Sequence, residues 1–110
     1  MSDPTRATGA DHPVIVFASF RPIQGKEEEL HALLSWMVEN TRSEPGCERY
    51  DLYRHPAPGE TFHLFERYQS NEALEEHRAA DHYIEYRRQV KDLINGPVDV
   101  VLLQEVDAAR

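Results

Sequence analysis

Apolar residues follow a strand-like pattern at both ends of the chain. Residues 14–20 read VIVFASF, and residues 98–106 read VDVVLLQEV. In both runs the apolar side chains occupy odd as well as even positions, which is typical of a strand buried on both faces. The pattern therefore predicts a first and a last strand that each need cover on both sides of their sheet.

A helical pattern follows the first strand, over residues 26–44. Its apolar stripe has the i, i+3, i+4, i+7 spacing of an amphipathic helix and consists of Leu30, Leu33, Leu34, Met37, Val38 and Thr41. Three glutamates, Glu27–Glu29, lie in the first turn, where the helix dipole favours negative charge. Pro45 and Gly46 are predicted to end this helix.

The middle of the chain predicts a β-hairpin. Residues 47–55 and 61–68 are strand-like, and the turn-rich residues 56–60 connect them.

Ser70 is predicted to cap a short helix that carries Ala73, Leu74 and His77 on one side. Asp81 is predicted to cap another, ended by residues 95–97. The inner face of that helix is predicted to carry Tyr83, Tyr86, Val90 and Ile94.

This order of elements predicts an α+β, ferredoxin-like βαββααβ fold with a four-stranded antiparallel sheet. We expect one domain over residues 13–107, preceded by a flexible N-terminal tail at residues 1–12. The helices of this fold cover one face of the sheet only. Since the first and last strands need cover on the second face, we expect a homodimer joined through the open sheet face.

Composition narrows the classes of partner. The chain has 110 residues and a net charge of -8, from 12 Lys and Arg against 20 Asp and Glu. An acidic surface repels phosphate, so we expect neither nucleic acid nor an anionic membrane as a partner. Cys47 is the single cysteine, which excludes an internal disulfide and a cysteine-based zinc site. Without an apolar signal or a membrane-length run, a cytoplasmic location is expected.

Two segments resemble the antibiotic biosynthesis monooxygenase family, in its quinol-monooxygenase-like branch. They are residues 42–52, RSEPGCERYDL, and residues 65–78, FERYQSNEALEEHR, with Asp81-His82-Tyr83 as the continuation. The resemblance runs from about residue 14 to residue 106. It implies a dimeric α/β barrel with a pocket between sheet and helices in each subunit.

The resemblance also implies an activity. It is the cofactor-independent oxidation of a small quinol or hydroxylated aromatic by dioxygen. A base removes a phenolic proton, the anion passes an electron to oxygen, and the radicals recombine. The protein supplies a dry apolar pocket, a proton acceptor and hydrogen-bond donors.

His77 and Glu66 are the candidate catalytic residues. His77 shares the inward helix face with Leu74, and an imidazole there can take a phenolic proton near neutral pH. The alternative for His77 is a core histidine bonded to a backbone carbonyl. Glu66 follows an apolar run within a strand, where it could orient His77 or bind a substrate hydroxyl. Its favoured alternative is a cross-strand ion pair with Arg21, Arg49 or Arg54.

The candidate substrate-binding residues are mainly aromatic: His82, Tyr83, Tyr86, Tyr50, Tyr68 and Trp36. Phenol groups can donate a hydrogen bond to a quinone oxygen while their rings wall a pocket. Each tyrosine taken singly is better explained as an amphipathic core residue. Trp36 flanks the apolar stripe, so it either roofs the pocket or is a partly buried flank.

We expect no metal and no other cofactor. His77 and His82 are five residues apart, whereas two ligands on one helix are three or four apart. Haem-degrading relatives have an Asn on the first strand and a Trp ending the third, where this chain has Phe20 and Tyr68. Cys47 is interpreted as a small buried hydrophobe.

Two other functions remain open at this point. One is isomerisation of a small carbonyl compound in the same pocket, with His77 and Glu66 moving the protons. The other is a non-catalytic dimer that binds a hydrophobic metabolite.

Overall fold

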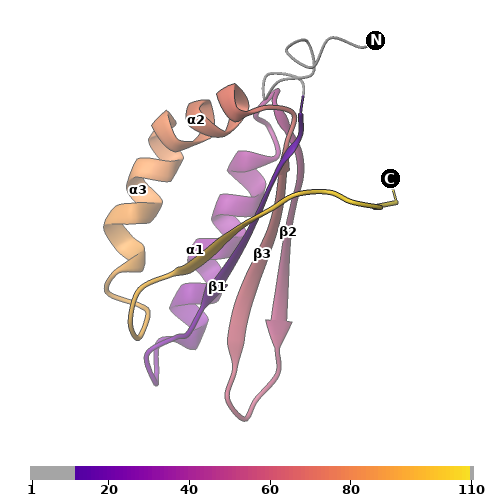
Figure 1. Cartoon of the computed structure of the whole chain (residues 1–110). Helices are drawn as coiled ribbons and strands as arrows, with labels where there is room; N and C mark the ends of the chain where they lie inside the picture. Colours follow the sequence, from indigo (N-terminus) through magenta and orange to yellow (C-terminus); the bar gives the residue numbers. More distant parts are fainter. Residues whose placement is uncertain (1–11, 110) are drawn as a thin grey trace, which may run out of the picture.

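The computed structural model describes residues 12–109 and has the predicted order of elements (Figure 1). The elements are β1 (Val14–Phe20), α1 (Glu27–Thr41), β2 (Cys47–His55), β3 (Thr61–Tyr68), α2 (Asn71–Ala79), α3 (Asp81–Val90) and β4 (Asp99–Leu103). The strands form one four-stranded sheet in the order β2-β3-β1-β4, with every neighbouring pair antiparallel. The predicted ferredoxin-like α+β fold is therefore confirmed.

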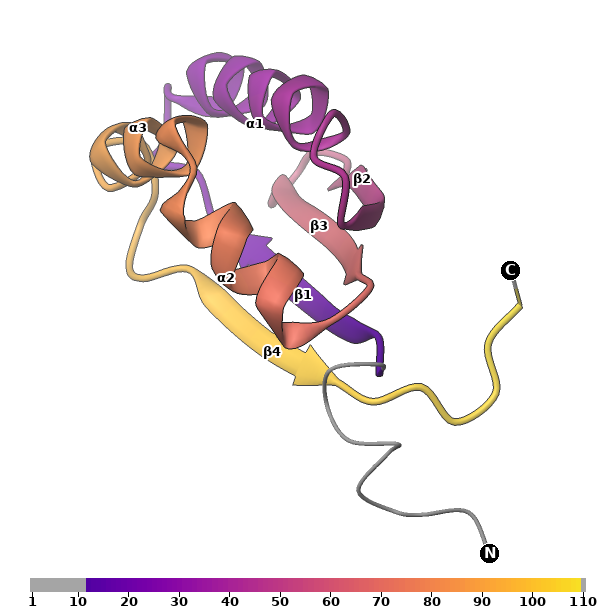
Figure 2. The ribbon, with the colours of Figure 1, turned by 90° about the horizontal axis from the view of Figure 1, so that it is seen from above.

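All three helices lie on one side of the sheet, as Figure 2 shows from above. The sheet itself is open and does not close into a barrel within the single chain. The dimeric barrel implied by the resemblance needs a second copy and stays a prediction. The N-terminal tail predicted for residues 1–12 lies, apart from His12, outside the described residues.

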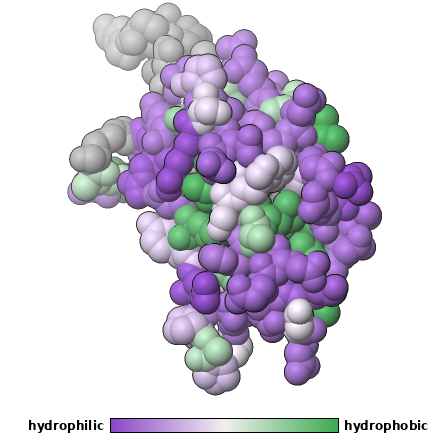
Figure 3. Space-filling view, turned by 180° about the vertical axis from the view of Figure 1, so that it is seen from behind, coloured by the Kyte–Doolittle hydropathy of each residue, from purple (hydrophilic) through white to green (hydrophobic). Residues whose placement is uncertain are grey.

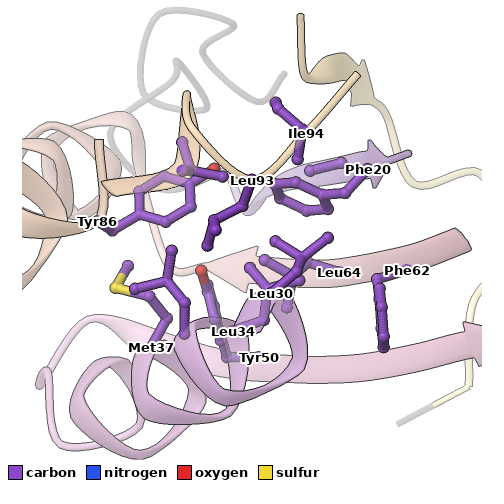
Figure 4. Close-up of a cluster of buried hydrophobic side chains, with 13 residues drawn as sticks. Phe20, Leu30, Leu34, Met37, Tyr50, Phe62, Leu64, Tyr86, Leu93 and Ile94 are labelled. Atoms are coloured by element: carbon purple, nitrogen blue, oxygen red, sulfur yellow. The ribbon is translucent and has the colours of Figure 1, made fainter. Parts of the chain in front are cut away.

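The core lies between α1, α3 and the sheet. The predicted stripe of α1 is buried except for Val38, which is partly buried, and Leu30, Leu34 and Met37 have no exposed surface. Figure 4 shows these side chains facing Tyr50 and Tyr86, which come from β2 and α3. Burying such apolar area stabilises the fold by about 25 cal/mol per Å², so this layer holds α1 and α3 against the strands.

The second predicted helix is capped as expected, and the third is not. The Ser70 side chain accepts a hydrogen bond from the backbone N–H of Ala73. At the third helix, Ala80 is the N-cap, no side chain caps it, and Asp81 is already helical. The helix ends at Val90, earlier than predicted, because the following residues pair with the segment after β1. Ile94 is buried there through a bridge to Pro22.

The last strand is shorter than predicted and is unburied. It spans Asp99–Leu103 rather than residues 98–106, and all five residues are exposed. Phe17 and Phe65 pair across the middle of the sheet on the face opposite the helices, next to Val101. The segment after β4 crosses this open side (Figures 1 and 2). Glu105 in this segment pairs with Arg67 of β3.

The surface is otherwise largely hydrophilic where Figure 3 views it, with a limited hydrophobic area near the centre of that face. Across residues 12–109, none of the helices combines the length and apolar character needed to cross a bilayer.

Candidate functional site

A carboxylate and two histidines converge where α2 meets α3. Glu44 lies in the connection between α1 and β2, His77 in α2 and His82 in α3. One oxygen of Glu44, Oε2, lies 2.8 Å from His77 Nδ1 and 2.5 Å from His82 Nε2. A carboxylate oxygen accepts, so each ring donates an N–H to Glu44, and His77 keeps Nε2 as its free acceptor nitrogen.

A break between two helices brings the histidines together. Ala80 has an extended backbone, with ψ of 150°, and separates α2 from α3. On one continuous helix, residues five apart would lie on different faces. Here the chain turns at Ala80, and the ring centroids of His77 and His82 lie 6.0 Å apart. The spacing argument that separated these two residues fails because they lie on different helices.

Glu66 occupies a second buried position, on β3. Its side chain accepts a hydrogen bond of 2.7 Å from the Tyr68 hydroxyl, and only 6% of its surface is exposed. Burial raises the pKa of Glu66 to about 7, against the lowering effects of the Tyr68 hydrogen bond and the nearby charge of Arg78. A carboxyl group with this pKa can take up and release a proton at neutral pH.

The ion pairs favoured for Glu66 from the sequence are not formed. Arg49 pairs with Asp51, Arg54 pairs with Glu60, and Arg21 forms no ion pair with Glu66 within residues 12–109. Glu66 also makes no hydrogen bond to His77 in this part of the chain. The strand places Glu66 on the helix-facing side, whereas Arg49 follows the pleat to the open side.

His77 is packed among aromatic rings. Its ring centroid lies 5.1 Å from that of Tyr83, 5.2 Å from that of Tyr68 and 5.7 Å from that of Tyr50. Burial lowers the pKa of His77, although its hydrogen bond to Glu44 acts in the opposite direction. Burial therefore favours the neutral imidazole over the charged imidazolium.

The side chains of Glu66 and His77 both line one cavity of about 50 Å³. Its lining includes Tyr50, Glu66, His77, Arg78, Tyr83 and Tyr86, with apolar cover from Val16, Ala18, Leu74 and Val100. Of the predicted site residues, the structure thus brings together Glu66, His77 and three tyrosines around one space. Tyr68 and His82 do not line this cavity. Tyr68 donates a hydrogen bond to Glu66, and His82 donates one to Glu44, which also binds His77.

Two other residues discussed from the sequence, one of them a site candidate, lie away from the cavity. Trp36 is 38% exposed and borders a separate depression between α1 and α3. Trp36 therefore flanks the apolar stripe as an exposed residue and does not roof this cavity. Cys47 is half-buried, and the pKa of its thiol is raised to about 12. The main cause is burial, and the negative charges of Glu44 and Glu66 add to it. The thiol is therefore protonated and unreactive at neutral pH.

Glu44 is the site residue that sequence reasoning missed. It belongs to the segment RSEPGCERYDL that carried the family resemblance, but nothing local distinguishes it from the other glutamates around α1. Its hydrogen-bond partners lie 33 and 38 residues further along the chain. The only available signal was its place directly before Pro45-Gly46, where the chain leaves the helix.

Glu44, His77 and His82 are also the residues that could hold a metal ion, since their ligand atoms lie within 4.8 Å of one another. Ligand atoms bound to one ion at about 2.1 Å stand more than about 3 Å apart. The separations of 2.8 and 2.5 Å are shorter than that. In this arrangement the three groups satisfy each other by hydrogen bonds, and the expected absence of a metal stays a prediction.

Together, the open antiparallel sheet and the buried carboxyl–imidazole site define a ferredoxin-like α+β protein with an enzyme-type cavity. Residues 13–89 match the family described as antibiotic biosynthesis monooxygenase (ABM). The chain belongs to the ABM family, and the resemblance seen in the sequence is confirmed.

Named relatives agree with this assignment. "Putative monooxygenase Rv0793" of Mycobacterium tuberculosis is 47% identical over 97 residues, covering 88% of this chain and 95% of that protein. "Putative monooxygenase YcnE" of Bacillus subtilis is 29% identical over 76 residues, covering 69% and 80%. These relatives and the family place the chain among monooxygenase-type enzymes.

Solved structures give the same result for the fold. The structure of Rv0793 has a TM-score of 0.83 and 47% identity, covering 89% of this chain and 99% of that one. PA3566 from Pseudomonas aeruginosa has a TM-score of 0.80 and 26% identity, covering 87% and 96%.

Proposed function

We propose that the protein is a cofactor-independent monooxygenase that oxidises a small quinol or hydroxylated aromatic with dioxygen. The observation that carries the proposal is the cavity shared by His77 and Glu66. It offers a neutral imidazole and a carboxyl of pKa about 7, with tyrosine rings around them. Deprotonating a phenol requires such a base, and the reaction with oxygen requires an apolar enclosure.

In the proposed reaction, His77 Nε2 removes the proton of a substrate hydroxyl. The resulting anion transfers one electron to dioxygen, and the substrate radical and superoxide combine to form a carbon–oxygen bond. The peroxide then loses water. A quinol and one O₂ thus give one hydroxyquinone and one H₂O, with one oxygen atom in each. In this reaction Glu66, whose pKa is raised to about 7, gives the proton to the leaving oxygen.

Glu44 provides a path to solvent for the proton that His77 accepts. His77 is 2% exposed, whereas the side chains of Glu44 and His82 are 15% and 17% exposed. Because both rings donate an N–H to Glu44 Oε2, the Nδ1 proton of His77 can pass to this carboxylate and from it to solvent, while the hydrogen bond from His82 holds the carboxylate in place. Glu44 also holds His77 in the tautomer that leaves Nε2 free.

Oxygen uptake by metal-stripped protein with menadiol tests this function. We expect uptake well above the autoxidation rate, and a loss of about 100-fold or more in His77→Ala, because general-base catalysis contributes about 10²–10⁴. Glu75→Gln, an exposed position on the same helix, is the matched control and should retain full activity.

Uptake no faster than autoxidation would contradict the oxygenase. Conversion of a carbonyl substrate without oxygen would instead support the isomerase considered from the sequence. That reaction would use the same two proton-exchanging groups.

We also propose that the protein is a homodimer joined through the open sheet face. Val101, Phe17 and Phe65 form one row across that face, and Val101 is 49% exposed. Covering apolar surface of this kind is the usual driving force for stable association.

Size-exclusion chromatography with light scattering tests the dimer. The native chain should have twice the monomer mass, and Val101→Glu should reduce it to the monomer mass, because a charge would be buried at the contact. Ile84→Glu, at a residue 58% exposed on α3, should remain dimeric. A native protein of monomer mass would be incompatible with this interface.

A further inference from the structure

A groove between α3 and β4 leads to the buried cavity. Its volume is about 410 Å³, and its lining includes Tyr83, Tyr86 and Val100, which also line the cavity. The cavity of about 50 Å³ is too small for an aromatic substrate, since pockets for organic ligands have about 300–1,000 Å³. The groove lies within that range, so it can take the body of a substrate whose reacting hydroxyl reaches the cavity.

Apolar side chains form most of this groove: the two tyrosine rings, Val90, Ile94, Pro97, Val98 and Val100. Val98 precedes β4, and Val100 belongs to it. This strand is at the edge of the sheet, and its residues are exposed. Such a surface suits a flat aromatic ring system, which can lie between the tyrosines of α3 and the valines of β4.

Two cations, Arg87 and Lys91, lie on the α3 side of the groove. The Lys91 ammonium donates to the backbone oxygen of Arg88 and lies 4.0 Å from Asp92. Arg87 makes no ion pair with a carboxylate among residues 12–109, and its guanidinium interacts with the hydroxyl of Tyr83, which raises the pKa of Arg87. Its neighbour Arg88 is paired with Glu85 and borders the depression on the other side of α3.

Arg78 is the other arginine near the site, and its position differs. It lines the deeper cavity beside Glu66 and lowers the pKa of that carboxyl. Its charge therefore acts on the catalytic group. Arg87 remains as the guanidinium that faces the groove without an acidic partner.

We propose that the substrate is an anionic aromatic, bound with its ring in this groove, its hydroxyl at His77 and Glu66, and a carboxylate at Arg87. This inference rests on the proposed function for the position of the hydroxyl. A guanidinium binds a carboxylate in a fork of two hydrogen bonds, which fixes orientation as well as charge. In a protein of net charge -8, an arginine beside an apolar groove whose partner is a tyrosine hydroxyl rather than a carboxylate favours acidic ligands locally.

The test compares binding of 6-hydroxy-2-naphthoate and 2-naphthol by calorimetry under nitrogen, where no oxidation occurs. These probes share the ring and the hydroxyl and differ in the carboxylate. We expect native protein to bind the naphthoate about 10-fold or more tightly than the naphthol, as for one well-placed charged hydrogen bond. Arg87→Gln should bind the two probes about equally, and the paired Arg88→Gln should keep the native preference.

A Val100→Trp variant locates the binding site. The larger ring would fill the junction of groove and cavity, so both probes should lose affinity while thermal unfolding confirms that the variant folds. Equal binding of the probes by native protein would overturn the proposal, as would a preference that survives in Arg87→Gln. Because binding is measured without oxygen, this outcome is independent of whether the enzyme is an oxygenase.

Discussion

Replacing Glu66 by glutamine is expected to stabilise the folded protein at pH 8 and to slow quinol oxidation by about 100-fold or more. Glutamine has nearly the same shape, and its carbonyl oxygen can still accept the hydrogen bond from Tyr68. What the substitution removes is the ability to carry a charge or a proton. Stability and activity should therefore change in opposite directions.

The pH dependence of the stability gain follows from the raised pKa of Glu66, about 7 against the ordinary value of 4.5. Below pH 4.5 the carboxyl is protonated in both the folded and the unfolded state, so its titration does not change the free energy of unfolding. Between pH 4.5 and 7 only the unfolded state loses the proton, and folding stability falls as pH rises. Above pH 7 the cost is constant, at about 3 kcal/mol for a shift of this size.

Urea unfolding of native protein and Glu66→Gln at pH 4, 6 and 8 measures this difference. The free energies of unfolding should agree at pH 4 and differ most at pH 8, with the variant more stable. Glu75→Gln, which is exposed, should follow the native protein at each pH. A difference between native and Glu66→Gln that does not depend on pH would show that the carboxyl is not held protonated by burial.

Gly46→Ala is expected to destabilise the fold by about 2–3 kcal/mol, in the range of overpacking substitutions, and to reduce activity with it. A Cβ at residue 46 would lie 2.4 Å from the Cβ of Ala73, which is buried on α2. The backbone cannot retreat freely, because the oxygen of Gly46 accepts a hydrogen bond from Gln69 N–H. Relief of the clash would push α2 from the Glu44 segment and separate Glu44 from His77.

The double variant Gly46→Ala/Ala73→Gly separates this clash from other effects. Removing the Ala73 Cβ leaves its Cα 3.4 Å from the new methyl group, which is an ordinary contact. Ala73→Gly alone should cost about 1 kcal/mol, the usual penalty of glycine in a helix. Together the two changes should cost less than their sum, with recovered activity. Strictly additive losses of stability in denaturant titrations would mean that the two residues are not in contact.

The hydrophobic pattern by itself determined most of the framework. The bounds of β1, β2 and β3 agree with the predicted runs, and the stripe from Leu30 to Thr41 is the buried face of α1. These elements are predictable because side-chain periodicity and a cap such as Ser70 act over a few residues. The same local rules placed His77 on an inward helix face.

The tertiary structure decided how that face becomes a site. The break at Ala80 sets His77 and His82 on two helices, and Glu44 then meets both from a loop more than thirty residues earlier. Contacts between such distant segments depend on how sheet and helices pack, and no local pattern records them. The raised pKa of Glu66 has the same origin, because it comes from desolvation by surrounding elements rather than from neighbours in sequence.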